Sequence, residues 1–336
     1  MTAKATFDFG NFAGDDILRV MREMQSQGIK PASGNKASNL ASIRSWFLDF
    51  LITTLTEVGH LDDKGNADVR LDVEVDVDLN SGDTAGIVQQ LWNARAKDWA
   101  VVETPITYTL TLDTFLHYFR PGDGTKQTVL SLGSGPGLYE TFLGMLFEHL
   151  EATKKFRVVC VDFAAKMTRK NEEILKTVRY PIPGTQTMRG VKNVEPITGD
   201  MTALTFPDQS VDHVLCNNSL QWVPDWKKAL AEMARVLKPG GYLYLFVHRH
   251  GMTVADEKDT VRLELDTFSV EDILDEIEKL GFEVGNMRQI GSQNGGQFGR
   301  RLDRVFVHAK YLPGKVLTPW RERSKSVSLS GFRANT

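Results

Sequence analysis

The sequence predicts an α/β fold: a doubly wound, mostly parallel sheet of seven strands, joined to a smaller N-terminal helical domain. Three features of the chain lead to this expectation. From about residue 128 onward, short apolar runs typical of buried parallel strands alternate with segments of helical periodicity. The first of these strands opens through a glycine-rich loop directly into a helix. Residues 1–84 lack this alternation and combine a helical apolar stripe with one alternating strand.

The glycine-rich loop lies in residues 128–137, Thr-Val-Leu-Ser-Leu-Gly-Ser-Gly-Pro-Gly, and a helical run over residues 138–150 follows it. Glycine lets the backbone approach a ligand, and a helix start offers unpaired N–H groups. The pattern is G-x-G-x-G, whereas the dinucleotide fingerprint would need its third glycine at Leu138. No P-loop Lys-Ser/Thr pair follows either. The loop therefore predicts a nucleotide site of another kind.

An acidic residue ends the next apolar run, residues 157–162. An acid at the tip of the second strand, here Asp162, can hold both hydroxyls of a ribose. At this point the chain resembles the class I, Rossmann-like S-adenosylmethionine-dependent methyltransferases of the small-molecule type. In that family the glycine loop packs against the methionine tail, while the acid binds the ribose.

The resemblance covers roughly residues 92–312 and implies S-adenosylmethionine as cofactor and S-adenosylhomocysteine as product. No metal is expected, because the scattered histidines lack a third ligand. Asp200 would contact the adenine amine. The family commonly has an acid two places before the first glycine, where this chain has Ser131, so that contact to the methionine amine must come from elsewhere. The residues that the resemblance places around the cofactor are Ser131, Gly133, Ser134, Gly135, Gly137, Asp162, Phe163, Met167, Asp200, Met201, Asn217, Asn218 and Ser219.

The helices, strands and loops expected after residue 162 are each indicated by a local sequence pattern. Lys-Pro-Gly-Gly at 238–241 is a helix stop, and the serine at 269 begins an amphipathic run that ends at Gly281. Residues 180–193, rich in proline and glycine, are expected to form an inserted loop, either near the substrate or on the plain surface. The expected elements are a strand at 211–216, a helix at 226–237, a strand at 242–247, a helix at 269–280 and a final strand at 304–308.

The N-terminal domain, residues 1–84, has an apolar helical face over 40–58 and a strand over 69–79 that alternates apolar with mostly acidic residues. Helices followed by a strand with a wing-like turn resemble the winged-helix dimerisation domains of some small-molecule O-methyltransferases. That resemblance implies a homodimer; a monomeric helical cap is the alternative. The acidic strand disfavours DNA as partner.

Residues 85–312 form the expected methyltransferase domain, in which the helical segment 85–120 would be a lid over the cofactor. In the family a lid tyrosine, here Tyr108, lies near the methionine carboxylate. A tail rich in serine and arginine, residues 313–336, is expected to pack loosely.

The composition of the chain limits the classes of partner and the cellular environment that we expect. The net charge of −3 gives no reason to expect nucleic acid. The two cysteines, Cys160 and Cys216, lie in predicted buried strands and suit a reducing interior. Neither a long apolar run nor a secretory pattern is found, so we expect a cytoplasmic protein without a membrane span.

The chemistry of transfer needs few catalytic groups, because attack on a sulfonium methyl neutralises its charge. The protein must align the acceptor and exclude water, and a base is needed only where the acceptor loses a proton. His248 and His250 follow the fifth strand and could supply that base, unless they belong to a solvated turn. Arg249 between them could pair with a substrate carboxylate.

The strand at 211–216 is followed by polar residues that either bind the cofactor or cap the next helix. Gln221-Trp222 resembles the Gln-Trp of methyltransferases that esterify small carboxylates, although Trp222 could equally be core. We therefore expect methyl transfer to a small molecule, most often at oxygen of a carboxylate or hydroxyl. The alternatives are sulfur or nitrogen acceptors, or a catalytically silent S-adenosylmethionine-binding regulator.

Overall fold

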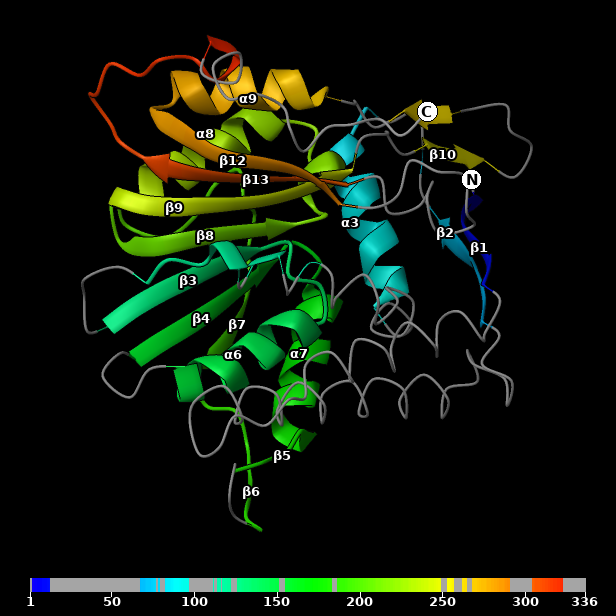
Figure 1. The fold of residues 1–336 in the computed structure, drawn as a ribbon. Coiled ribbons are helices and arrows are strands. Elements are labelled where there is room, and N and C mark those ends of the chain that lie inside the picture. The colour runs from blue at the N-terminus through cyan, green and yellow to red at the C-terminus, as the bar shows by residue number, and fades with distance from the viewer. Residues whose placement is uncertain are drawn as a thin grey trace.

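A seven-stranded sheet forms the centre of the computed structural model (Figure 1). The structure describes residues 2–12, 67–76, 78, 82–96, 111, 114–115, 117–121, 126–150, 155–182, 186–248, 253–256, 262–264, 268–290 and 304–322. The sheet order is β12-β13-β9-β8-β3-β4-β7, and β13 alone runs antiparallel to its neighbours. The strands are β3 (Lys126–Leu132), β4 (Lys155–Asp162), β7 (Val194–Thr198), β8 (Val211–Asn217), β9 (Leu237–His248), β12 (Phe282–Ile290) and β13 (Arg304–Tyr311). The predicted doubly wound, mostly parallel seven-stranded sheet is confirmed.

Helices cover both faces of this sheet (Figure 1). One face carries α6 (Leu138–Leu150) and α7 (Ala165–Thr177), and the other carries α8 (Trp226–Val236) and α9 (Val270–Lys279). Successive residues of one strand enter opposite cores: Val129 packs beneath α6, and Leu130 packs with α8 and α9. Burial on both sides explains why these strands are almost continuously apolar in the sequence. Both cysteines are buried free thiols, as expected.

The strand order reverses between β3 and β8, since β4 follows β3 on one side and β8 lies on the other. Ligands of open α/β sheets bind outside the carboxyl ends of the strands at such a point. The helix α3 (Thr84–Arg95) lies beside this edge of the sheet (Figure 1). The topology thus places a helix from the predicted lid segment over the predicted ligand crevice.

Helix boundaries follow their capping residues. Ser269 and Asp272 form a capping box at the start of α9, and Asp225 caps α8 through the Lys228 amide. α8 ends at Val236, and the Lys-Pro-Gly-Gly stretch is already part of β9. A Cβ at Gly241 would lie 2.8 Å from the Asp212 carbonyl oxygen, so glycine permits the close approach of β8 and β9 there.

A second, four-stranded antiparallel sheet has the order β11-β10-β1-β2. The alternating strand expected over 69–79 is present as β2, two residues earlier at its start. Its neighbour β1 was not anticipated, and neither were the strands contributed by residues 253–264, inside the predicted methyltransferase domain. The helical face over 40–58 lies outside the described residues, and the homodimer stays a prediction. The strands are β1 (Thr2–Phe12), β2 (Ala67–Asp76), β10 (Thr253–Asp256) and β11 (Arg262–Glu264).

The insertion at 180–193 and the C-terminal tail both contain more ordered structure than the loop and loosely packed tail that the sequence predicts. The insertion at 180–193 contains a short hairpin of β5 (Tyr180–Pro181) and β6 (Met188–Arg189), which extends away from α3 at the lower end of Figure 1. In the C-terminal tail, Trp320 packs on the core of α8 and α9, and its backbone N–H donates to Glu278 at 2.6 Å. Residues 323–336 lie outside the described part of the chain.

Candidate functional site

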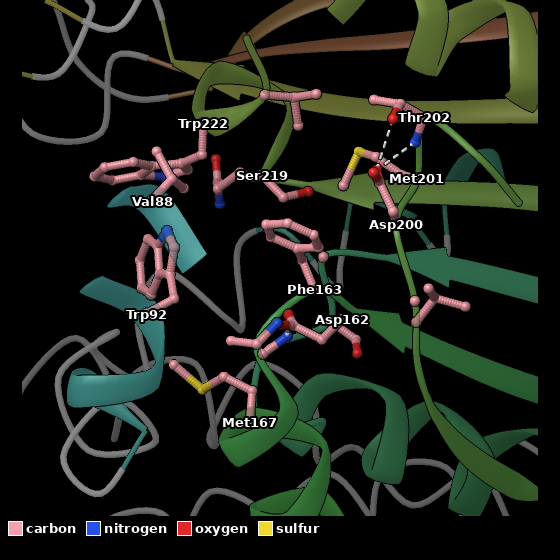
Figure 2. A pocket seen from close by; sticks show the side chains of 18 of the residues that line it. Val88, Trp92, Asp162, Phe163, Met167, Asp200, Met201, Thr202, Ser219 and Trp222 are labelled. Atoms are coloured by element: carbon pink, nitrogen blue, oxygen red, sulfur yellow. Dashed lines mark hydrogen bonds between the residues drawn. The ribbon is translucent and has the colours of Figure 1, made fainter. Parts of the chain in front are cut away.

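A cavity opens at the carboxyl ends of β3, β4 and β8, between the sheet and α3 (Figure 2). Most of the predicted cofactor-binding residues meet there, although they come from four separate stretches of the chain. Val88, Trp92 and Trp222 lie on one side, Asp200 and Met201 on the other (Figure 2). The predicted residues that line the cavity are Gly133, Ser134, Gly135, Asp162, Phe163, Met167, Asp200, Met201, Asn217, Asn218, Ser219 and Trp222.

Three predicted residues do not line the cavity: Ser131, Gly137 and Gln221. Gly137 contacts α7 instead, because a Cβ there would lie 1.8 Å from Asn171 Nδ2. Gln221 supports the wall from behind and donates from Nε2 to the Asn218 carbonyl at 2.8 Å. The backbone of His248 ends β9 at the same sheet edge. Tyr108, Arg249 and His250 lie outside the described residues.

The glycine loop is held by backbone hydrogen bonds on one side and by close packing on the other. The Gly133 and Ser134 amides donate to the Val161 carbonyl at 2.8 and 3.2 Å. Gly133 has φ +64°, and a Cβ on it would lie 2.2 Å from Ser219 Cβ. Ser219 in turn donates to the Leu132 carbonyl at 2.8 Å. Only glycine fits at position 133, where the loop meets the segment after β8.

Asp162 connects the loop to the start of α7. Its Oδ2 accepts the Gly135 amide at 2.7 Å, and its Oδ1 accepts the Ala164 amide at 2.8 Å. Burial raises the pKa of this carboxyl to about 6, although the two amide hydrogen bonds act in the opposite direction. Each carboxylate oxygen can accept a second hydrogen bond, so both remain able to receive a ligand hydroxyl.

The helix α3 is fastened to the segment that follows Asp162. Gln89 Nε2 donates to the Phe163 carbonyl at 3.0 Å, and Asn93 Oδ1 accepts the Lys166 amide at 2.9 Å. The N-cap of α7 is Ala164, which provides no side-chain cap. Asn93 therefore caps α7 from another helix. Sequence reasoning missed both residues, although an alanine at a helix start was a signal that its cap comes from elsewhere.

The opposite wall is formed by the loops after β7 and β8. Asp200 Oδ1 accepts from the Thr202 amide at 2.7 Å and from Thr202 Oγ1 at 2.9 Å (Figure 2). Asn218 adopts a left-handed conformation with φ +52°, a strained state for a non-glycine residue. Such strain is found at ligand-binding loops when the surrounding structure imposes it.

Trp222 belongs to a short 3-10 turn, η1 (Leu220–Trp222), and meets Trp92 of α3 edge to face with ring centroids 4.8 Å apart. The contact closes one side of the cavity with aromatic surface. The two interpretations of Trp222, packing residue and cavity wall, are therefore compatible: it is buried and also lines the cavity.

Ser131 is buried behind the glycine loop, and its hydroxyl donates to Glu140 Oε1 at 2.6 Å. Glu140 belongs to the first turn of α6 and itself lines the cavity. Glu140 was not predicted as a site residue, because acidic residues in the first turn of a helix are ordinary.

The described charged side chains that line the cavity all carry the same sign of charge. Every charged side chain among the described lining residues is a carboxylate, and no lysine or arginine is found among them. A crevice with one sign of charge attracts ligands of the opposite sign. This lining suits a cation and disfavours the pyrophosphate of a dinucleotide. The four acids are Glu140, Asp162, Asp200 and Asp225.

The part of the chain that builds this cavity matches a known domain family. A family profile described as "Methyltransferase domain" matches residues 130–245, from within β3 to within β9. Over these residues the chain is similar to methyltransferase domains, in agreement with the resemblance stated from the sequence.

Particular relatives cover shorter stretches. A protein named demethylmenaquinone methyltransferase from Geobacillus stearothermophilus is 38% identical over 85 residues, 25% of this chain and 32% of the relative. One of the same name from Listeria monocytogenes is 44% identical over 73 residues, 22% of this chain and 29% of the relative. The chain thus spans about a third of the length of these curated relatives. A crystal structure of a SAM dependent methyltransferase from Aquifex aeolicus has TM-score 0.45 and 22% identity, covering 66% of this chain and 98% of that chain.

Within the described part of the chain, no group of three or more His, Cys, Asp or Glu side chains has an arrangement able to hold a metal ion. No helix in the described residues has the length and apolar character needed to cross a membrane.

Proposed function

We propose that the chain binds S-adenosylmethionine in this cavity and transfers its methyl group to a small-molecule acceptor. The observation that carries the proposal is that every charged side chain among the described lining residues is a carboxylate, at a glycine loop and strand switch point within the residues that match a methyltransferase domain. S-adenosylmethionine carries a sulfonium and an ammonium, so an acidic crevice stabilises it.

Each wall then has a role. The Gly133–Gly135 loop packs against the methionine tail, and the two oxygens of Asp162 accept the ribose hydroxyls. Phe163 and Met201 offer apolar faces to the adenine, and Asp200 accepts its amine. Tyr108 contacts the methionine carboxylate. The hydrogen bonds from the Gly135 and Ala164 amides hold Asp162 in place before the ligand arrives, which lowers the ordering cost of binding.

The acceptor occupies the side lined by Val88, Trp92, Trp222, Val223 and Pro224. Their surface is apolar and partly aromatic, and the nearby acids repel an anion. As the methyl acceptor we therefore favour the oxygen of a neutral hydroxyl over the oxygen of a carboxylate. Sulfur and nitrogen acceptors are less favoured alternatives. The name of the curated relatives refers to methylation of demethylmenaquinone, a small molecule, and supports this substrate class.

A hydroxyl acceptor loses a proton during transfer, so a base is required. His248 at the end of β9 and His250 beyond it are our candidates, and Arg249 lies between them. The remaining chemistry is alignment of the acceptor with the S–CH3 bond and exclusion of water by the Trp92–Trp222 pair.

Calorimetric titration with S-adenosylmethionine and S-adenosylhomocysteine tests cofactor binding. Asp162→Asn keeps the side chain's shape but loses its charge, and we expect affinity to fall about 10- to 100-fold, as for a hydrogen bond to a charged group. Asp208→Asn, which alters an exposed carboxylate paired with Arg235, serves as the control. Equal affinity of wild type and Asp162→Asn contradicts the ribose assignment.

The second candidate is a regulator that binds S-adenosylmethionine without transfer, because Ser131 stands where the family commonly has an acid. Incubation with methyl-labelled cofactor and a metabolite extract separates the two. Label in a small molecule supports the enzyme. Tight cofactor binding without label in any fraction supports the regulator.

A further inference from the structure

One stretch of the chain is strongly basic, although the chain as a whole carries a net charge of −3. Residues 165–193, which include α7 and the hairpin of β5 and β6, contain seven lysines and arginines against two glutamates. One of these glutamates, Glu173, pairs with Lys170 at 3.3 Å. The stretch therefore has the opposite sign of charge to the rest of the chain. Its basic residues are Lys166, Arg169, Lys170, Lys176, Arg179, Arg189 and Lys192.

The outer side of α7 carries three of these basic residues. The helix buries Met167 and Asn171 against the body of the domain. Lys166, Arg169 and Lys176 are exposed, and their spacing along the helix places them on one side of it. They form a basic stripe along the helix, because the inward side is occupied by its buried residues.

The hairpin extends this stripe beyond the end of the helix. Arg179 donates from Nη1 to the Lys176 carbonyl at 3.0 Å, and a Cβ at Gly190 would lie 3.3 Å from the same nitrogen. The end of α7 and the chain that returns from the hairpin therefore lie side by side. Lys192 follows Gly190 by two residues and is exposed. The basic surface consists of Lys166, Arg169, Lys176, Arg179 and Lys192.

The hairpin also exposes an apolar side chain. Met188 of β6 is 52% exposed, and the hairpin that carries it extends away from the body of the molecule (Figure 1). Its neighbour Arg189 is held by Glu148 of α6, with 3.3 Å between Nε and Oε2. The hairpin is thus fixed to the domain at its base, while Met188 is presented to the surroundings beside the basic surface.

We propose that the basic surface and Met188 together bind the surface of an anionic lipid bilayer. Lysine and arginine are attracted to the phosphates of anionic lipids, and an apolar side chain among them enters the headgroup region. Attachment of this kind requires no membrane-spanning helix. The inference goes beyond the proposed methyl transfer and does not depend on it.

A nucleic acid is the competing partner for a basic surface, because its backbone is also anionic. Single-stranded nucleic acid is bound by basic side chains together with aromatic rings on which the bases stack. The one aromatic residue of 165–193, Tyr180, is fully buried. An exposed methionine on a projecting hairpin contributes nothing to contact with phosphates, whereas it loses contact with water on entering a bilayer. The surface therefore favours lipid over nucleic acid.

The test is co-sedimentation of the full-length protein with two kinds of vesicle, phosphatidylcholine alone and an equal mixture of phosphatidylcholine and phosphatidylglycerol. We expect binding to the anionic vesicles only, and weaker binding as salt is added. The double variant Lys176→Glu/Lys192→Glu should weaken binding by about tenfold or more, because two attractions become repulsions. Met188→Ser should weaken it by about threefold, because only the apolar contact is lost.

Lys315→Glu and Val316→Ser are the matched controls. Both residues are exposed in the C-terminal tail, and Lys315 lies beside the end of α9. α9 lies at the upper end of Figure 1, whereas the hairpin lies at the lower end. Neither control should change vesicle binding. Thermal unfolding of every variant verifies that the fold is retained.

The outcomes separate this inference from the proposed function. Equal binding to the two kinds of vesicle, binding to neither, or unchanged binding by the folded double variant overturns it. Binding to poly(U) RNA in place of the anionic vesicles assigns the surface to nucleic acid and overturns it as well. The affinity of the wild-type protein for S-adenosylhomocysteine is measured without vesicles and tests the proposed function alone.

Discussion

The side of the cavity that we assign to the cofactor and the side that we assign to the acceptor are built from different kinds of interaction. On the cofactor side, backbone amides of Gly133 and Gly135 are bound to β4 and Asp162, and little room is left for any other residue. On the acceptor side, the rings of Trp92 and Trp222, which come from distant segments of the chain, meet edge to face.

The two sides should differ in how well they tolerate amino-acid substitutions. Where the cavity wall is formed by closely packed backbone, even one added atom forces the chain to move. Where the wall is formed by side chains, a substitution changes the shape and selectivity of the cavity while the fold persists. We therefore expect substitutions on the cofactor side to have the larger effects on binding and stability.

The largest effect is expected for Gly133→Ala. The left-handed conformation costs alanine roughly 1–2 kcal/mol, and the clash with Ser219 adds about 1–3 kcal/mol of overpacking. Cofactor binding should be lost, and urea denaturation should show the combined destabilisation.

Gly314→Ala is its control, because Gly314 has φ +76° and nothing lies within 4 Å of the place that a Cβ would occupy. It should show the conformational cost alone and normal cofactor affinity. Similar destabilisation of the two variants would contradict the role of close packing at Gly133.

A pH dependence of cofactor binding should follow from Asp162. Its pKa of about 6 is above the usual value, so the carboxyl becomes protonated as pH falls below 6 and accepts ribose hydroxyls less well. Affinity should decline as pH falls below about 6, toward the affinity of Asp162→Asn. Titrations between pH 5 and 8 measure it, and the slope should vanish in Asp162→Asn.

The contribution of Asp162 to the stability of the ligand-free protein changes with pH in the opposite direction to cofactor affinity. Because the folded pKa is raised above the unfolded one, this group's contribution is most favourable at low pH and is lost as pH rises through about 6. His308 acts in the other direction: burial lowers its pKa to about 4, so its contribution is lost as pH falls from about 6.5 toward 4.

A smaller and selective effect is expected for Trp92→Ala. The edge-to-face contact with Trp222 would be lost, at about 0.5–1.5 kcal/mol. The KM for the acceptor should rise about 3- to 10-fold, while S-adenosylhomocysteine affinity changes little. Trp92→Phe should restore most of the difference. An equal loss of cofactor affinity would show that the two sides are not separable.

The smallest effect is expected for Asn93→Ala, which removes the cap that α3 provides to α7. Loss of a helix cap costs about 1 kcal/mol, which thermal or urea unfolding can measure. Gln89→Ala removes the neighbouring hydrogen bond to Phe163 without touching the α7 cap, and should cost less. If Gln89→Ala were the more destabilising, Asn93 would not be the cap that matters.

Much of the central domain could be predicted from local signals. The G-x-G-x-G loop, the acid at the end of β4 and the serine that begins α9 each act within a few residues of chain. The small sheet could not be predicted in full, because β1 pairs with β10 across more than two hundred residues, and no local pattern encodes that partner. The same holds for Glu140 and Asn93, whose contacts depend on how α6 and α3 pack.

The sequence by itself determined the main strands and helices of the seven-stranded sheet, the turn residues between them and the acid at the end of β4, because these depend on side-chain periodicity and backbone preference over short distances. Only the tertiary structure decided which helix supplies a missing cap, which acid stands behind the loop and which tryptophans meet across the cavity. Those contacts join residues far apart in the chain, and their geometry exists only once the layers have packed.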